Sequence, residues 1–148
     1  MEKRLNVQEI LPEAFKAMLG LEKYLAATQL SKTHKELIKI RASQVNRCAY
    51  CIDMHTKDAL QYGETPQRIF LLNAWKETDL FSEEEQVILS MTEEVTLIHR
   101  AGLSANTYKK ATEKFGVEYT AQLLMMIVTI NAWNRIAIST QLPVAAIS

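Results

Sequence analysis

Residues 36–55 read ELIKIRASQVNRCAYCIDMH, and this stretch holds both cysteines of the chain. The pattern is Cys48-x-x-Cys51-x-x-x-His55, preceded by Glu36. If Cys48 opens a helix, Cys51 lies in the first helical turn and His55 follows it at i+4, so these two side chains share a face. Two thiols at this spacing can close a disulfide, and a helix N-terminus stabilises a thiolate. The stretch therefore predicts a helix that begins at a dithiol, with an imidazole beside it.

Glu36 lies in the preceding predicted helix, at the boundary between its polar and apolar faces. Two interpretations of this glutamate are open. Thr33 and Glu36 have the spacing of a capping box, in which the glutamate accepts a hydrogen bond from the N-cap backbone. Alternatively, the carboxylate faces the seam between two helices, where it can relay a proton with His55. Arg41 falls on the apolar face, so we expect it to pair with a carboxylate that anchors two helices.

Together, Glu36, the cysteine pair and His55 resemble the signature of the AhpD-like alkylhydroperoxidase branch of the carboxymuconolactone decarboxylase family. The segment NAWNRIAIS near the C-terminus is similar to members of that family as well. The resemblance implies that Cys51 attacks a hydroperoxide, Cys48 forms the disulfide with it, and Glu36 and His55 move the proton. One position departs from AhpD, which has a second histidine between its cysteines where this chain has Tyr50.

From the residues alone the order of the two cysteines stays open. A helix N-terminus favours the Cys48 thiolate, whereas His55 favours the Cys51 thiolate. A zinc site built on these three side chains needs a fourth ligand. No further cysteine exists, and the other histidines are His34 and His99. The sequence therefore favours redox chemistry over a metal site, and we expect no bound metal.

The resemblance implies a thiol-dependent peroxidase that reduces hydrogen peroxide or organic hydroperoxides through a dithiol/disulfide cycle. It implies no bound cofactor, and it requires an external dithiol, either a reductant protein or a small dithiol such as a dihydrolipoyl carrier. Two alternatives are a lactone decarboxylase of the same family and a non-enzymatic redox-sensing oligomer. The lactone decarboxylases do not depend on a CxxC pair, so the two cysteines count against the first alternative.

Composition sets the fold class and excludes some partners. The chain has 148 residues, is 48% hydrophobic, and contains only four glycines and three prolines. These values predict an all-α single domain over residues 1–148, a bundle of about six or seven helices. Lysine and arginine number 17 and aspartate and glutamate 17, so nothing favours binding to nucleic acid or to a membrane. The N-terminus lacks the apolar segment of a secretory signal, and we expect a cytoplasmic protein.

Cap and stop residues place the predicted helices. Helix starts are expected at Pro12, Ser31 or Thr33, Cys48, Thr65-Pro66, Ser82 with a Glu85 capping box, and Ser104. Residues 1–11 are expected to form an extended lead-in, and Gly116 is expected to end one helix before the last begins near residue 118. That last helix, reaching about residue 140, is apolar nearly all round. We therefore expect part of its surface to lie in a homo-oligomer interface, in a trimer or hexamer.

Overall fold

The computed structural model describes residues 4–146, which form eight α-helices and one 3₁₀ helix with no strand among them. The elements are α1 (Val7–Ile10), α2 (Pro12–Ala26), α3 (Lys32–Asn46), α4 (Ala49–Gln61), α5 (Pro66–Leu71), η1 (Leu72–Glu77), α6 (Glu83–Thr96), α7 (Ile98–Ala101) and α8 (Ala105–Thr140). The predicted all-α class is confirmed. Two of the eight α-helices, α1 and α7, are single turns of four residues each.

Side-chain caps fix the helix starts where the sequence predicts them. The hydroxyl groups of Ser31, Thr65 and Ser104 each accept the backbone N–H three residues on. Ser82 and Glu85 form the predicted capping box at the start of α6. Each cap satisfies one or two of the N–H groups that a helix start leaves without an intrahelical partner.

The prediction of an extended lead-in over residues 1–11 is partly wrong. Residues 7–10 form one helical turn, because the Asn6 side chain caps it by accepting the N–H groups of Gln8 and Glu9. The first three residues of that predicted segment lie outside the described residues. Helix α6 ends at Thr96, and the separate turn α7 follows it and ends before Gly102.

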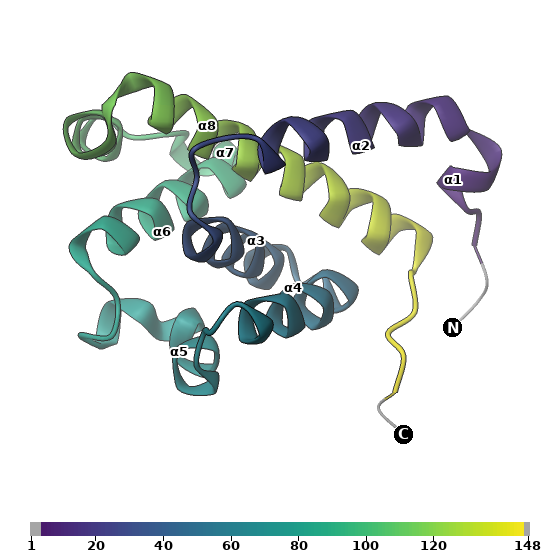
Figure 1. Ribbon diagram of the computed structural model, residues 1–148, viewed down its shortest axis with the longest axis horizontal. Helices are drawn as coiled ribbons and strands as arrows, with labels where there is room; N and C mark the ends of the chain where they lie inside the picture. Colours follow the sequence, from purple (N-terminus) through teal and green to yellow (C-terminus); the bar gives the residue numbers. More distant parts are fainter. Residues whose placement is uncertain (1–3, 147–148) are drawn as a thin grey trace.

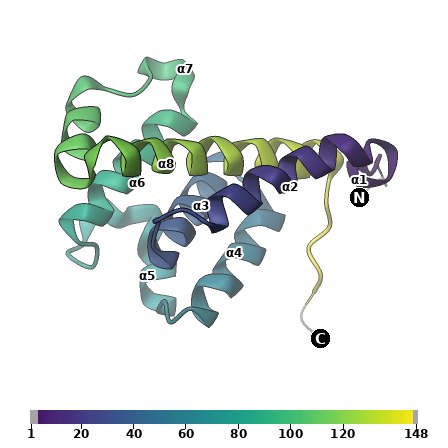
Figure 2. The same cartoon turned by 45° about the horizontal axis from the view of Figure 1, so that its top comes forward.

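The core lies where α3, α6 and α8 pack against one another. Figures 1 and 2 show α8 running the length of the molecule beside α2, with α3 and α6 against it and α4 on the side of α3. Fully buried side chains from the three central helices include Ile38 and Ala42, Ile88 and Met91, and Leu123, Ile127 and Ile130. Burying each large aliphatic side chain contributes roughly 1.5–3 kcal/mol, so this cluster fixes α3 and the segment that follows it.

An ion pair holds α3 to α6, as the position of Arg41 predicts. Arg41 Nε donates to Glu93 Oε1 at 2.9 Å, and both side chains are mostly buried. Glu93 also accepts from Trp75 Nε1 at 2.7 Å and from Lys76 Nζ at 3.0 Å. Burial acts to raise the pKa of Glu93, but these donors outweigh it, so the pKa lies below its ordinary value.

Helix α8 contains the two predicted C-terminal helices joined end to end. Gly116 interrupts it with φ +80°, a conformation that glycine adopts without strain, so the predicted break lies at the predicted residue. By length and composition α8 is apolar enough to cross a membrane, but its inner face belongs to the central core. Its outer face leaves Leu124, Val128 and Ile138 exposed.

Candidate active site

The break between α3 and α4 places the two cysteines. Arg47 closes α3 in the left-handed conformation at φ 59°, and Cys48 is the N-cap of α4. The N–H of Cys48 donates to Ser43 O at 2.9 Å, which holds the break against the end of α3. The expected helix start at the dithiol is therefore present.

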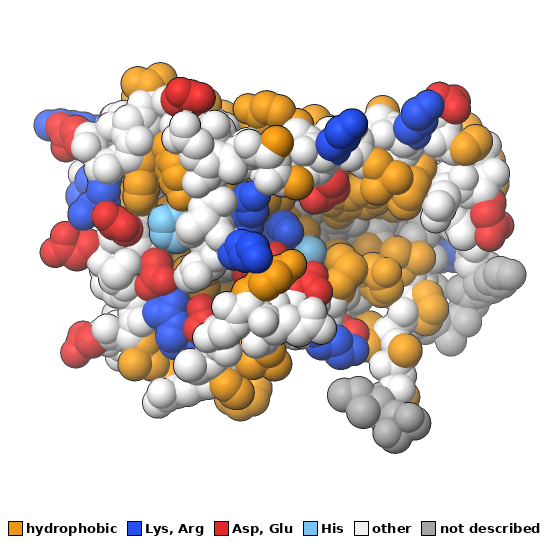
Figure 3. Space-filling model, viewed as in Figure 1, with side chains coloured by type: hydrophobic (Ala, Val, Ile, Leu, Met, Phe, Trp, Pro, Cys, Tyr) orange, Lys and Arg blue, Asp and Glu red, His pale blue; other side chains and the backbone are white. Residues whose placement is uncertain are grey.

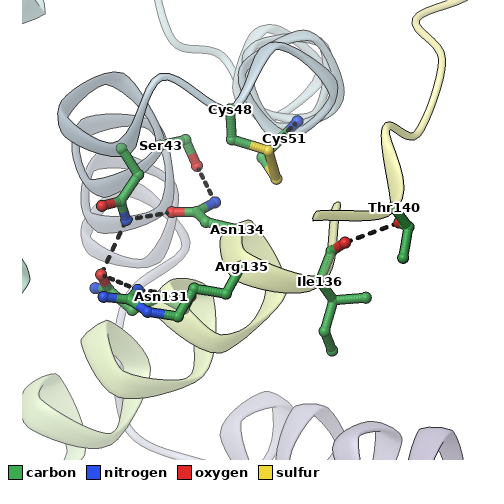
Figure 4. The surroundings of a disulfide bond; sticks show 9 residues. Ser43, Cys48, Cys51, Asn131, Asn134, Arg135, Ile136 and Thr140 are labelled. Atoms are coloured by element: carbon green, nitrogen blue, oxygen red, sulfur yellow. Dashed lines mark hydrogen bonds between the residues drawn. A yellow bond between two sulfur atoms is a disulfide. The ribbon is translucent and has the colours of Figure 1, made fainter. Parts of the chain in front are cut away.

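Cys48 and Cys51 form a disulfide across the first turn of α4, with their Cα atoms 5.4 Å apart (Figure 4). Both side chains are almost fully buried, and they pack against Ala137 of α8. The N–H of Cys51 points at Cys48 Sγ from 3.4 Å, so the Cys48 sulfur occupies the N-cap acceptor position. A thiolate formed at Cys48 on reduction would keep this donor and the helix dipole.

His55 and Glu36 meet in the seam between α4 and α3. His55 Nδ1 lies 3.4 Å from Glu36 Oε2, and both residues are more than nine-tenths buried. The other carboxylate oxygen of Glu36 accepts from Lys39 Nζ at 3.1 Å. Ser31 caps α3 and Glu36 points inward, so the interpretation of Thr33 and Glu36 as a capping box is wrong. Thr33 and Glu36 have the spacing of a capping box, but the N-cap of α3 is Ser31, so Thr33 already lies inside the helix.

The charge on Glu36 is set by competing effects. Burial raises the pKa of this carboxyl, but His55 and then Lys39 lower it by more, so the pKa lies below its ordinary value. Glu36 is therefore ionised at neutral pH. The 3.4 Å approach of His55 Nδ1 to Glu36 Oε2 lacks hydrogen-bond geometry, and neither atom has another hydrogen-bond partner among residues 4–146.

A cavity of about 380 Å³ opens beside the disulfide. Cys51 and His55 both line it, whereas Cys48 does not. Its other walls are mostly apolar, and Figure 3 shows hydrophobic side chains gathered around the hollow below α2. The remaining lining residues are Phe15, Glu22, Lys39, Tyr50, Met54, Asp58, Trp133, Ile136, Ala137 and Leu142. Tyr50, at the position that departs from AhpD, thus lies at this cavity.

Comparison with known proteins places the chain in a family. The model of the carboxymuconolactone decarboxylase family matches residues 12–94. The chain belongs to this family. It is 45% identical over 139 residues to the uncharacterised protein YdfG of Bacillus subtilis strain 168. The aligned region covers 94% of this chain and 95% of YdfG. The resemblance predicted from the cysteine motif is therefore confirmed.

Solved structures of similar proteins agree with this assignment. A protein of unknown function from Agrobacterium tumefaciens, provisionally assigned to antioxidant defence as AhpD, is 34% identical with a TM-score of 0.95 over 99% of this chain and 100% of that one. The debrominase Bmp8 has a TM-score of 0.80 at 18% identity over 91% of this chain and 73% of that one. The second likeness is one of fold alone.

In this member of the carboxymuconolactone decarboxylase family, Asp58 completes the site, and sequence reasoning did not single it out. Asp58 Oδ2 lies 3.7 Å from His55 Nδ1, and its side chain is 42% exposed. The signal was available, because Asp58 follows His55 at i+3 and residues at that spacing meet on a helix surface. Glu36, His55 and Asp58 together offer three possible metal ligands within 4.8 Å of one another.

A buried amide network behind the disulfide was also missed (Figure 4). Asn134, fully buried on α8, donates to Ser43 Oγ at 3.0 Å and accepts from Asn46 Nδ2 at 2.9 Å. Asn46 Nδ2 is also 2.9 Å from Asn131 Oδ1. Arg135 Nη1 donates to Asn131, at 3.0 Å to the backbone oxygen and 3.1 Å to Oδ1. The amides of the NAWN segment thus tie α8 to the end of α3, next to the cysteines.

Proposed function

We propose that this protein is a thiol-dependent peroxidase that reduces hydroperoxides through its Cys48/Cys51 pair. The observation that carries the proposal is the disulfide at the start of α4, with Cys51 and His55 on the wall of one cavity. Family membership and the likeness to the Agrobacterium protein support a role of this kind. We infer that a small oxidant reaches Cys51 through this cavity, because Cys51 forms part of its wall.

The proposed cycle begins with the reduced protein. The Cys51 thiolate attacks the terminal oxygen of a hydroperoxide, the O–O bond breaks, and the leaving oxygen takes a proton to become an alcohol or water. Cys51 is then a sulfenic acid. The Cys48 sulfur attacks it, water leaves, and the disulfide forms. An external dithiol returns both cysteines to thiols by exchange and is itself oxidised to a disulfide.

The two sulfurs have different surroundings, which supports this order. Cys51 lines the cavity, whereas Cys48 does not and occupies the N-cap position. The helix N-terminus stabilises a Cys48 thiolate, which suits a sulfur that must attack a neighbouring sulfenic acid without a base of its own. Attack on the external oxidant is therefore assigned to Cys51 and resolution to Cys48.

Glu36 and His55 are proposed as the proton relay. The ionised Glu36 carboxylate close to Nδ1 favours the tautomer of His55 that carries its proton on Nδ1. Nε2 then has a free lone pair to take the proton of the Cys51 thiol. The same imidazolium can protonate the leaving oxygen after the O–O bond breaks.

The proposed substrate is hydrogen peroxide or an organic hydroperoxide, and the reductant is a thiol protein or a small dithiol such as a dihydrolipoyl carrier. A cavity of about 380 Å³ with mostly apolar walls is large enough for an organic group. We further propose a cytoplasmic homo-oligomer that works without a bound cofactor. A reducing compartment keeps the resting dithiol ready to react.

Single cysteine variants test the cycle. Hydroperoxide should consume both thiols of the wild-type protein, and steady turnover should follow when a dithiol is supplied. Cys48→Ser should accumulate a sulfenic acid that a dimedone-type probe traps, and Cys51→Ser should give none. Trapping on Cys51→Ser would overturn the assigned order. One stoichiometric oxidation without turnover, accompanied by a change in oligomer size, would instead identify a redox sensor.

A further inference from the structure

The contact between Glu36 and His55 leaves two buried polar atoms without partners. Glu36 Oε2 and His55 Nδ1 face one another at 3.4 Å and form no hydrogen bond with any residue of 4–146. Buried polar atoms in this state are rare, and each one needs a physical reason. The Asp58 carboxylate lies on the solvent side of the same imidazole nitrogen, at 3.7 Å. One nitrogen and two carboxylate oxygens therefore lie close together, and no residue of the described part of the chain forms a hydrogen bond with the two buried atoms among them.

The spacing of these atoms suits a metal ion. Zinc binds imidazole nitrogen and carboxylate oxygen at about 2.0–2.2 Å, and ligands in a tetrahedral shell then lie roughly 3.4 Å apart. The separations of 3.4 Å and 3.7 Å at His55 Nδ1 are close to that value. We propose that Glu36, His55 and Asp58 bind one divalent transition-metal ion, with Zn²⁺ as the probe, and that water completes the shell.

Metal binding here would switch off the proton relay, an effect that rests on the proposed peroxidase function. A metal on Nδ1 takes the lone pair of that nitrogen, so the remaining imidazole proton must reside on Nε2. Nε2 then has no lone pair with which to accept the proton of the Cys51 thiol. The metal also neutralises Glu36, and the site becomes an inhibitory one.

Lys39 places a positive charge beside the proposed metal site, which opposes the binding of a cation. Its ammonium group donates to Glu36 Oε1 at 3.1 Å, which leaves Oε2 for the metal but puts a positive charge close to it. Removing that charge should strengthen binding of a cation. A simple loss of folding in the variant would do the opposite, so the two explanations predict changes of opposite sign.

The test is calorimetric titration of the disulfide form with ZnCl₂, because reduced Cys48 and Cys51 would bind zinc themselves. We expect one ion per chain. Asp58→Asn should weaken binding at least about tenfold, His55→Ala should abolish it, and Lys39→Met should tighten it several-fold. Asp53→Asn is the matched control, since Asp53 lies on the same helix with a similarly exposed side chain that pairs with Lys57.

The outcomes separate the metal site from the peroxidase. Equal zinc affinity in the wild type, Asp58→Asn and Asp53→Asn would overturn the site, and so would weaker binding by Lys39→Met. Binding to the disulfide form needs no catalytic activity, so it stands or falls independently of peroxide turnover. If turnover is found, inhibition is compared at equal buffered free Zn²⁺, because the reduced cysteines and the dithiol reductant also bind zinc. Half-inhibition of Asp58→Asn should need at least about tenfold more free Zn²⁺ than half-inhibition of the wild type. A wild type no more sensitive than Asp58→Asn would refute the inhibitory role.

Discussion

Replacing Asn134 with alanine should destabilise the protein by an amount that its contacts allow us to work out. Asn134 is fully buried, donates to Ser43 Oγ at 3.0 Å and accepts from Asn46 at 2.9 Å. Two hydrogen bonds of about 1 kcal/mol each are lost. Asn46 keeps Asn131 as a partner, but Ser43 Oγ has no other among residues 4–146. An orphaned hydroxyl adds about 1 kcal/mol or more, so we expect a loss of about 3 kcal/mol in the free energy of unfolding.

Urea unfolding at one protein concentration measures this change. With a slope of about 2 kcal/mol per molar urea, the midpoint should fall by about 1.5 M. Asn106→Ala, at an exposed position of α8, is the control and should stay within about 0.5 kcal/mol of the wild type. A double-mutant cycle with Ser43→Ala should give a coupling energy of about 1 kcal/mol. A change below about 0.5 kcal/mol for Asn134→Ala would refute the network as the tie between α8 and α3.

Three further predictions follow from other parts of the structure. The pKa values of Glu85 and Glu93 lie below the ordinary 4.5, so their stabilisation is fully present above that pH and is lost as the pH falls through the folded values; urea midpoints measured from pH 6 to pH 3 should drop below about pH 4.5. Gly116→Ala should lower the free energy of unfolding by about 1 kcal/mol or more, measured in urea, because φ is +80° there. Leu124→Glu with Val128→Glu, on the exposed side of α8, should reduce the oligomer mass in light scattering, and an unchanged mass would place the interface elsewhere.

Features set by neighbouring residues could be predicted from the sequence. The hydroxyl caps at Ser31, Ser82 and Ser104 and the break at Gly116 each depend on a few consecutive residues. The cysteine spacing belongs to the same class, because the first turn of a helix fixes how two sulfurs three residues apart approach each other. The family motif added Glu36, which lies in the preceding helix, as a partner of His55.

Features that depend on packing between helices could not be read from spacing alone. Glu36 fits both a capping box and an inward-facing carboxylate, and only the position of α4 against α3 decides between them. Asn134 gives no local sign that it will meet Ser43, which is 91 residues away. The backbone at Leu97 separates α6 from the single turn α7, and leucine is not a residue type that predicts the end of a helix.

The Glu36–His55 contact breaks the rule that buried polar atoms are paired, and such exceptions concentrate at functional sites. If function retains this pair at a cost in stability, an apolar replacement of both residues should stabilise the fold. Glu36→Met with His55→Leu should raise the free energy of unfolding by about 1–3 kcal/mol, because Lys39 and Asp58 can both reach water once their partners are gone. Glu36→Met alone should destabilise, since it leaves His55 buried beside an uncompensated ammonium group. Urea unfolding of the three proteins decides the matter: a double variant less stable than the wild type would show that this pair stabilises the fold and needs no functional explanation.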